Sequence, residues 1–212
     1  MRQRYKWFSE RVIYCGVLAK EIEIAYYGIN REDTVSQLHK LGAKFIGKYL
    51  MRRINFQLAN RGKLGTQSYY TSWIRIREKG KIATLALKEQ EGNKITGRKE
   101  FEVEVSDFDT SAKIIYKALK KPVFDYFENY REEYSLSGTV ITIDKFPNLP
   151  YIMEIEGKTK ASIDSLLKKM EIKGKLDKNK SVPTDEYYAL HGYDYKKVQK
   201  RYKHKIEMLL KE

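Results

Sequence analysis

The stretch SWIRIREKGKIATLALKEQEGNKITGRKEFEVEVS, residues 72–106, decides the fold class of this chain. It contains three runs in which apolar and polar residues alternate, at 72–78, 82–88 and 98–106. A period of two is typical of a β-strand that buries one face. The pieces EKGK and QEGNKITG between the runs contain glycine, which favours turns. We therefore expect three neighbouring antiparallel strands here.

More strands are expected on both sides of this stretch. Runs of strand character stand at 20–28, 44–58, 123–136, 139–146 and 151–157. Capping residues and helical spacing predict helices at 30–41, from 107 or 109 to 120, at about 160–172, at 184–191 and in the C-terminal tail. Residues 59–70 are expected to form a loop. Many antiparallel strands with few helices indicate an α+β fold with a closed or nearly closed sheet.

Composition sets the class of protein. The 212 residues suit one substantial domain, and a hydrophobic content of 42% supports a real core. No apolar run of about 18 residues predicts a membrane span, and the N-terminus does not have the pattern of a signal peptide. Cys15 is the single cysteine, so no disulfide can form within the chain. We expect a cytoplasmic protein.

The formal net charge of +14 is concentrated in three segments. Most of the excess lies in residues 1–20, 168–180 and 196–212. Solvated ends and a solvated helix face explain this distribution better than a nucleic-acid surface, because no zinc knuckle, RNA-binding aromatic motif or helix-turn-helix signature accompanies it. Nucleic acid is therefore a possible but not a favoured partner. The basic segments are expected to be dispensable for catalysis, provided that the tail does not pack on the sheet.

Strand alternation also places many charged residues on one face of each predicted strand. These residues are Glu21, Glu23, Arg75, Arg77, Lys88, Arg98, Glu100, Glu102, Glu104, Asp144, Glu154 and Glu156. On any one strand, the simplest interpretation is that such a face is the solvent-exposed face of an antiparallel sheet. These faces carry mostly charged residues and few Ser, Thr or Asn residues. If the sheet curls with these faces inward, the charged side chains would line a cavity.

Such a cavity would have a specific chemistry. Paired carboxylates repel each other unless a divalent cation lies between them. Ligation by oxygen alone suits Mg²⁺, Mn²⁺ or Ca²⁺ rather than Zn²⁺. Arginine and lysine side chains on the neighbouring strands are suited to phosphate oxygens. The pattern predicts a site for a metal and a phosphorylated compound.

The order of these stretches resembles that of the CYTH domain, the fold of the triphosphate tunnel metalloenzymes. The matching stretches are EIEI at 21–24, LGAKFIGKYLMRRINF at 41–56, WIRIRE at 73–78, ATLALK at 83–88, RKEFEVEV at 98–105, REEY at 131–134 and ITIDKFPNLPYIMEIEG at 141–157. The resemblance implies an eight-stranded antiparallel β-barrel, or tunnel, with flanking helices. It divides the chain into an extension (1–19), a tunnel domain (20–195) and a basic helical tail (196–212).

The resemblance also implies roles for individual residues. The metal ligands, for Mg²⁺ or Mn²⁺, would be Glu21, Glu23, Asp144, Glu154 and Glu156. The phosphate ligands would be Arg75, Arg77, Lys88 and Arg131, with Arg53 and Arg98 as weaker candidates. Among these, Glu21, Glu23, Arg75, Arg77 and Lys88 would serve catalysis.

Two positions depart from the family pattern. The opening signature of the family is Glu-x-Glu-x-Lys, and Ala25 stands at the lysine position. A basic residue that often precedes the arginine at 131 is also missing, since Asn129 and Tyr130 stand there. These changes are compatible with an altered substrate, a reduced turnover or a protein that only binds.

The function that the resemblance implies is metal-dependent chemistry on a triphosphate. The overall pattern is most similar to the class IV adenylyl cyclases, which convert ATP to cyclic AMP and pyrophosphate. One alternative is a triphosphatase that hydrolyses thiamine triphosphate or inorganic triphosphate. Another is a non-catalytic binder of a nucleotide or an RNA 5′-triphosphate. A monomer or a homodimer without a membrane partner is expected.

Overall fold

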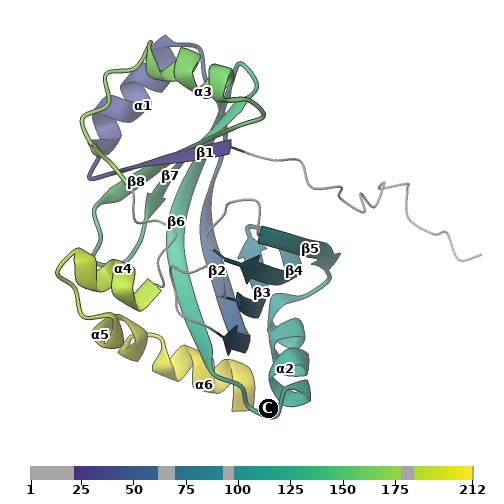
Figure 1. Ribbon diagram of the computed structural model, residues 1–212. Coiled ribbons are helices and arrows are strands. Elements are labelled where there is room, and N and C mark those ends of the chain that lie inside the picture. The colour runs from purple at the N-terminus through teal and green to yellow at the C-terminus, as the bar shows by residue number, and fades with distance from the viewer. Residues whose placement is uncertain (1–21, 62–69, 93–97, 178–183, 212) are drawn as a thin grey trace, which may run out of the picture.

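The computed structural model describes residues 22–61, 70–92, 98–177 and 184–211. Its centre is one antiparallel sheet of nine strands in the order β5-β4-β3-β2-β6-β7-β8-β1-β9 (Figure 1). The strands are β1 (Ile22–Tyr27), β2 (Lys44–Arg61), β3 (Tyr70–Lys79), β4 (Ile82–Glu91), β5 (Arg98–Val105), β6 (Phe124–Leu136), β7 (Thr139–Lys145), β8 (Tyr151–Gly157) and β9 (Lys175–Leu176). The α+β class predicted from alternation is confirmed.

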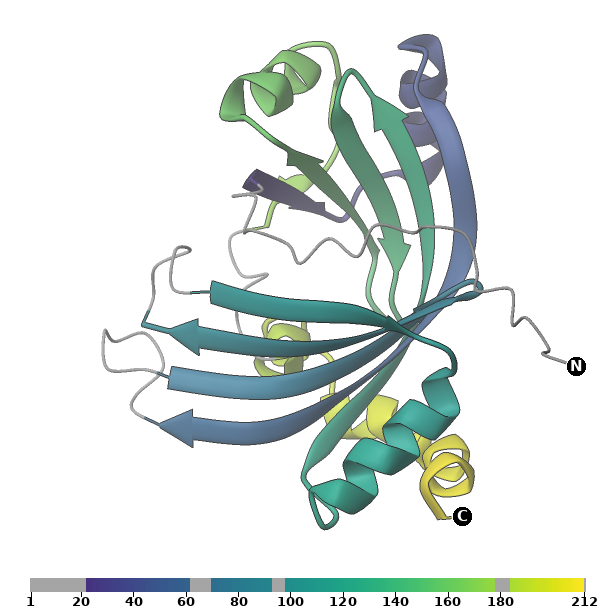
Figure 2. The same ribbon diagram turned by 90° about the vertical axis from the view of Figure 1, so that its right-hand side faces the viewer.

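The described sheet is not the closed eight-stranded barrel that was expected. Its edges are β5 and β9, and no pairing joins β5 to β1 within the described residues. The outer edge of β1 pairs instead with β9, where Tyr26 faces Leu176 and Tyr27 faces Lys175. This short strand therefore uses hydrogen-bonding groups of β1 that closure would require. The sheet is nevertheless strongly curled, with β3, β4 and β5 diverging from β7, β8 and β1 (Figure 2).

Two groups of helices cover the apolar face of the sheet. α1 (Arg31–Lys40) and α3 (Lys160–Leu167) pack through Leu38, Ile163 and Leu166 on the half that contains β7 and β8. α2 (Phe108–Ala118) packs through Phe108 and Ala112 on the half that contains β3 and β4. With this face covered, the opposite, charged face is the one available for a ligand.

The helices begin where the sequence predicts. Asn30 caps α1 by accepting from the backbone N–H of Asp33, and Asp107 caps α2 by accepting from that of Thr110. The helix expected over 160–172 ends earlier, at Leu167. Two shorter helices, α4 (Thr184–Leu190) and α5 (Tyr195–Lys200), lead into α6 (Lys203–Lys211). None of the helices in the described part of the chain is long and apolar enough to cross a membrane.

The basic tail is part of the core rather than only a solvated end. Val198, Tyr202, Ile206 and Leu210 are buried in the same apolar cluster as Phe108. The helical spacing of these four residues places them on one side of the tail, and the lysines between 196 and 205 remain exposed. The boundary predicted at 196 stays a prediction, but the interpretation of the tail as merely solvated is wrong.

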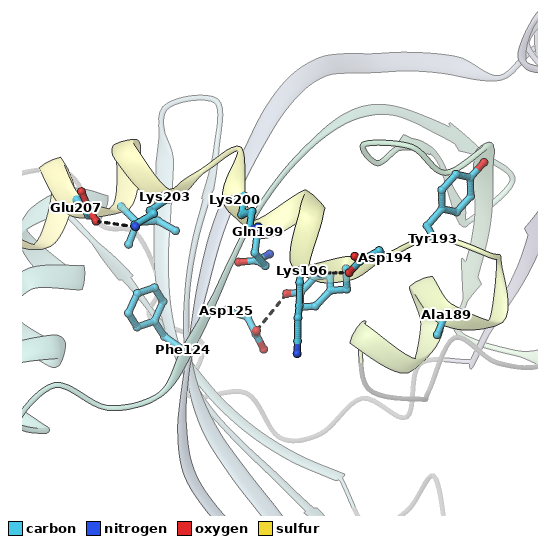
Figure 3. A pocket seen from close by; sticks show the side chains of 12 residues that line it. Phe124, Asp125, Ala189, Tyr193, Asp194, Lys196, Gln199, Lys200, Lys203 and Glu207 are labelled. Carbon is cyan, nitrogen blue, oxygen red and sulfur yellow. Dashed lines mark hydrogen bonds and ion pairs between the residues drawn. The ribbon is translucent and has the colours of Figure 1, made fainter.

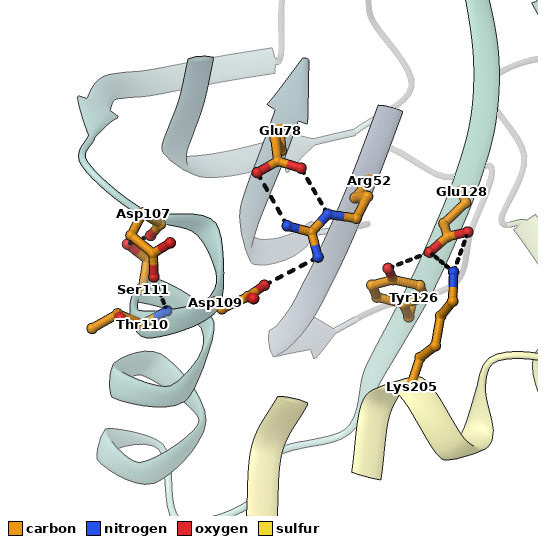
Figure 4. Close-up of polar contacts among 9 residues, drawn as sticks. All are labelled: Arg52, Glu78, Asp107, Asp109, Thr110, Ser111, Tyr126, Glu128 and Lys205. Carbon is orange, nitrogen blue, oxygen red and sulfur yellow. Dashed lines mark hydrogen bonds and ion pairs between the residues drawn. The ribbon is translucent and has the colours of Figure 1, made fainter. Parts of the chain in front are cut away.

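Ion pairs on the covered face fix α2 and α6 to the sheet (Figure 4). Arg52 in β2 donates to Glu78 at 2.7 Å and to Asp109 in α2 at 3.1 Å. Lys205 in α6 donates to Glu128 in β6 at 2.8 Å. Arg52 is thus occupied on this side of β2, while the next residue, Arg53, points to the other.

Candidate functional site

The strand register brings the predicted charges onto one continuous face of the sheet. Directly opposite residues of paired strands share a face. The opposite pairs are Glu23 with Glu156, Ala25 with Glu154, Asp144 with Arg131, Arg53 with Arg77, Arg75 with Asn55, and Lys88 with Glu100. We call this the polar face. Glu21 lies outside the described residues, and only the backbone of Arg98, opposite Gln90 in β4, is described.

Carboxylates of β5 hold the basic residues of β3 and β4. Arg75 Nη2 lies 2.7 Å from Glu100 Oε1 and 3.1 Å from Glu102 Oε2, and Arg77 Nη2 lies 3.3 Å from the same Glu102 oxygen. Lys88 Nζ lies 2.7 Å from Glu100 Oε2. Burial and the nearby cation Arg75 lower the pKa values of both Arg77 and Lys88. The three cations therefore form one cluster whose charge is only partly neutralised.

Arg131 is the centre of a second cluster, on β6, β7 and β8. Its Nε and Nη2 donate to the two oxygens of Asp144 at 2.8 and 2.6 Å, and Nη2 also lies 3.1 Å from Glu154 Oε2. Asp144 is only 1% exposed, and Asn129 Nδ2 donates to it at 2.7 Å. Hydrogen bonds and attraction from Asp144 outweigh burial and raise the pKa of Arg131. Arg131 is therefore charged and rigidly oriented.

Sequence reasoning missed two features of these clusters. In the sequence Asn129 shows only that a basic residue is missing, whereas in the structure its Nδ2 donates to Asp144. Glu100 and Glu102 were placed on the charged face without partners, yet they hold all three cations of β3 and β4. The signal that could have revealed this contact is the register of β4 and β5. If residues 82–106 are treated as a β-hairpin, Lys88 comes to lie opposite Glu100.

The acidic residues of β1 and β8 are the part of the polar face that suits a metal. Glu23 and Glu156 are directly opposite, so their Cβ atoms lie about 5 Å apart on one face. Two carboxylates at such a spacing fit a hard divalent cation. Asp144, as arranged here, fits less well because Arg131 takes both its oxygens. No group of three or more His, Cys, Asp or Glu able to hold a metal is present in the described part of the chain.

One hollow in the described part of the chain lies away from these residues. It has a volume of about 1070 Å³ and is formed by β6 with α4, α5 and α6 (Figure 3). Its acidic groups are already engaged, since Asp125 accepts from the Tyr195 hydroxyl, Asp194 caps α5 and Glu207 lies 4.0 Å from Lys203. None of the predicted site residues that the structure describes lines it. The polar face is therefore the better candidate, because charges from eight strands, β1 to β8, converge there.

Comparison with known proteins agrees with this geometry. The family model described as CYTH domain matches residues 19–184, which is more than half of the chain. This chain belongs to the CYTH family. The resemblance inferred from the strand order is thereby confirmed, and CYTH proteins usually process triphosphates with a divalent metal.

Solved structures share the CYTH fold at low identity. The PH1012 protein from Pyrococcus horikoshii is 20% identical with a TM-score of 0.56, over 70% of this chain and 88% of that one. The PH1819 protein from the same organism is 18% identical with a TM-score of 0.56, over 82% and 99%. A protein of Vibrio parahaemolyticus described as a candidate adenylate cyclase is 13% identical with a TM-score of 0.51, over 72% and 88%. These likenesses support the fold alone. No curated protein matches the chain.

Proposed function

We propose that this CYTH protein is a metal-dependent enzyme acting on a nucleoside or organic triphosphate, and that it converts ATP to cyclic AMP and pyrophosphate. The observation that carries the proposal is the gathering of Arg75, Arg77, Lys88 and Arg131 on the polar face, beside the carboxylates of β1 and β8. A triphosphate carries several negative charges within a short span. A row of cations from separate strands complements it better than a single basic residue does.

Each cation has a definite role in this proposal. Arg75, Arg77 and Lys88 would exchange the carboxylates of Glu100 and Glu102 for phosphate oxygens. This exchange keeps the cations hydrogen-bonded in both states, so binding does not leave them unpaired. Arg131 would bind a phosphate oxygen in a fixed orientation, because Asp144 holds its other side.

The acidic end of the polar face would hold Mg²⁺ or Mn²⁺ through Glu23 and Glu156, with Glu21, Glu154 and Asp144 as further predicted ligands. The bound ion supplies neutralisation of charge that develops on the phosphate oxygens. In the cyclase reaction the ribose 3′-oxygen would form a bond to the α-phosphorus while the bond from that phosphorus to the bridging oxygen of the β-phosphate breaks. Pyrophosphate would leave, and the hydroxyl proton would pass to solvent water. The protein side chains align and neutralise the phosphates during this displacement.

Ala25 favours a second candidate function. Ala25 is 1% exposed and directly opposite Glu154. At this position β1 therefore contributes no cation to the polar face. A CYTH protein that lacks this cation is compatible with a non-catalytic binder of triphosphates. A triphosphatase is the remaining alternative. In that reaction water attacks a terminal phosphorus, and the same metal and phosphate ligands would hold the substrate.

A product assay tests the three functions. The protein is incubated with ATP, thiamine triphosphate or tripolyphosphate and Mg²⁺ or Mn²⁺, and cyclic AMP, pyrophosphate and phosphate are resolved. Equal yields of cyclic AMP and pyrophosphate from ATP are expected. Phosphate release instead supports the triphosphatase, and tripolyphosphate binding without turnover supports the binder.

Two variants sharpen the assay. Arg77→Met removes a cation of the polar face and should lose turnover and binding. Lys99→Met removes the same charge from an exposed position on the opposite face of β5 and should retain both. Wild-type protein that neither binds nor converts any of the three triphosphates contradicts the proposal.

A further inference from the structure

Arg53 occupies an unusual environment on the polar face. It stands in β2 opposite Arg77 in β3 and Phe127 in β6. Its guanidinium lies over the rings of Phe127 and Phe146, with 5.5 and 5.1 Å from Cζ to the ring centroids. These rings attract a cation but accept no strong hydrogen bond from it. The guanidinium therefore has aromatic walls and still needs acceptors for its N–H groups.

Those acceptors are almost missing within the described residues. Arg53 Nη2 reaches Asn129 Oδ1 only at 3.4 Å, and the buried Nε atom has no partner there. The other arginines of the face whose side chains are described, Arg75, Arg77 and Arg131, each lie within 3.3 Å of a carboxylate oxygen. Arg53 has no carboxylate within ion-pair distance in the described chain.

Arg53 is partly buried, and a partly buried cation without an ion-pair partner is costly for a folded protein. Burial, together with the neighbouring cations Arg131 and Arg75, lowers the pKa of Arg53 to about 10. The guanidinium nevertheless remains protonated at neutral pH, and the attraction of Asp144 and Glu154 offsets its charge only in part. Arg75, on the adjacent strand β3, also has a buried Nε atom without a hydrogen-bond partner among the described residues. The same face also holds one unmatched acceptor, Asn55 Oδ1, opposite Arg75. The unmatched groups are thus two donors and one acceptor, and this excess of donors favours an anionic ligand.

The position of Arg53 indicates which anion fits. The charges that act on it are Asp144, Arg131 and Glu154 from one part of the face and Arg75 from the other. Glu154 is the residue directly opposite Ala25. Arg53 therefore lies between the basic strands β3 and β4 and the acidic strands β7 and β8. A polyphosphate that contacts both parts would pass beside its guanidinium.

We infer that Arg53 is a specificity-determining ligand for a phosphate oxygen, and that it supplies from β2 a cation that Ala25 does not supply from β1. The inference rests on the proposed function and deepens it. Its substrate class is a linear polyphosphate group that is long enough to contact Arg75 and Arg131 at the same time.

The test is a pair of measurements on Arg53→Met. Methionine keeps an unbranched chain against the two rings and removes the charge. Titration calorimetry with inorganic tripolyphosphate should show affinity weakened by about 10- to 100-fold, the range expected for one charge-assisted hydrogen-bonding group. The melting temperature of the ligand-free variant should be equal to or above that of the wild type, because an unpaired buried charge has been removed. Arg53→Lys should recover part of the affinity.

Controls separate the possible failures. Lys99→Met, on the exposed opposite face, should bind tripolyphosphate as the wild type does. Unchanged affinity in Arg53→Met overturns the inference. A lower melting temperature of ligand-free Arg53→Met, combined with no recovery of affinity in Arg53→Lys, also overturns it, because this result would indicate a packing role. If the wild-type protein itself does not bind tripolyphosphate, the proposed function fails and the role of Arg53 fails with it.

Discussion

Replacing Arg131 by methionine should destabilise the protein far more than replacing Arg53. Arg131 donates to both oxygens of Asp144, at 2.8 and 2.6 Å, and the exposed fraction of the Asp144 side chain is 1%. In Arg131→Met the Asp144 carboxylate stays buried and keeps Asn129 as its close donor. Removing one partner of a buried ion pair costs about 3–5 kcal/mol, because the other charge is left uncompensated.

This cost can be converted into a change in melting temperature. For a domain of this size, 1 kcal/mol corresponds to roughly 2–4 °C. The melting temperature of Arg131→Met should therefore fall by roughly 6–20 °C. A double variant, Arg131→Met with Asp144→Leu, removes both charges and should recover most of the loss, since an apolar pair of similar volume can replace a buried ion pair.

Urea unfolding of the wild type, the two single variants and the double variant completes the cycle. The coupling energy between positions 131 and 144 is expected to reach about 2 kcal/mol or more. A loss below about 1 kcal/mol in Arg131→Met, or no coupling between the two changes, would refute the reasoning. Asp144 would then be solvated or held by another group, and its availability to a metal would have to be reconsidered.

Four further predictions follow from the same contacts. Glu156→Gln should lower turnover at limiting Mn²⁺ by at least about 10- to 100-fold with an unchanged circular dichroism spectrum, and normal Mn²⁺ dependence would contradict its role as a ligand. Ala25→Lys, made in the Arg53→Met background, should restore part of the affinity for tripolyphosphate in calorimetry, and a further loss would show that the space beside Glu154 excludes a second cation. Because burial and Arg75 lower the pKa of Lys88, its ammonium loses its proton at a lower pH than an ordinary lysine, so substrate affinity should fall on the alkaline side and Lys88→Arg should move that fall to higher pH. Removing residues 200–212 should unfold or strongly destabilise the protein in thermal scans, because three large buried side chains at about 1.5–3 kcal/mol each are lost, and a melting temperature like that of the full chain would contradict this.

Much of the secondary structure was predictable because its causes are local. Alternation over WIRIR and FEVEV specifies which side chains of β3 and β5 share a face, whatever the rest of the chain does. Asn30 and Asp107 cap their helices through a side chain and an N–H three residues apart, which sequence spacing reveals. The family resemblance has the same origin, since it depends on the order of such local patterns.

The tail illustrates what local patterns miss. Its lysines dominate the composition of 196–212, and composition alone suggested a solvated end. Four apolar residues at helical spacing carry the opposite information, but only contact with Phe108 in the core cluster makes their burial evident. The predicted antiparallel sheet is confirmed, but its closure into a barrel is not seen among the described residues. There Lys175 and Leu176, which have no strand signal of their own, pair with part of β1.

The sequence by itself determined that charges line one face of an antiparallel sheet, because the direction of a strand side chain depends only on its position along that strand. Which charges meet was decided by the tertiary structure, since pairing depends on strand order, register and curl. The bonding of Arg131 to Asp144, the holding of Arg75 by Glu100 and the lack of a carboxylate beside Arg53 among the described residues are all of this kind. Each joins residues that no spacing along the chain relates to one another.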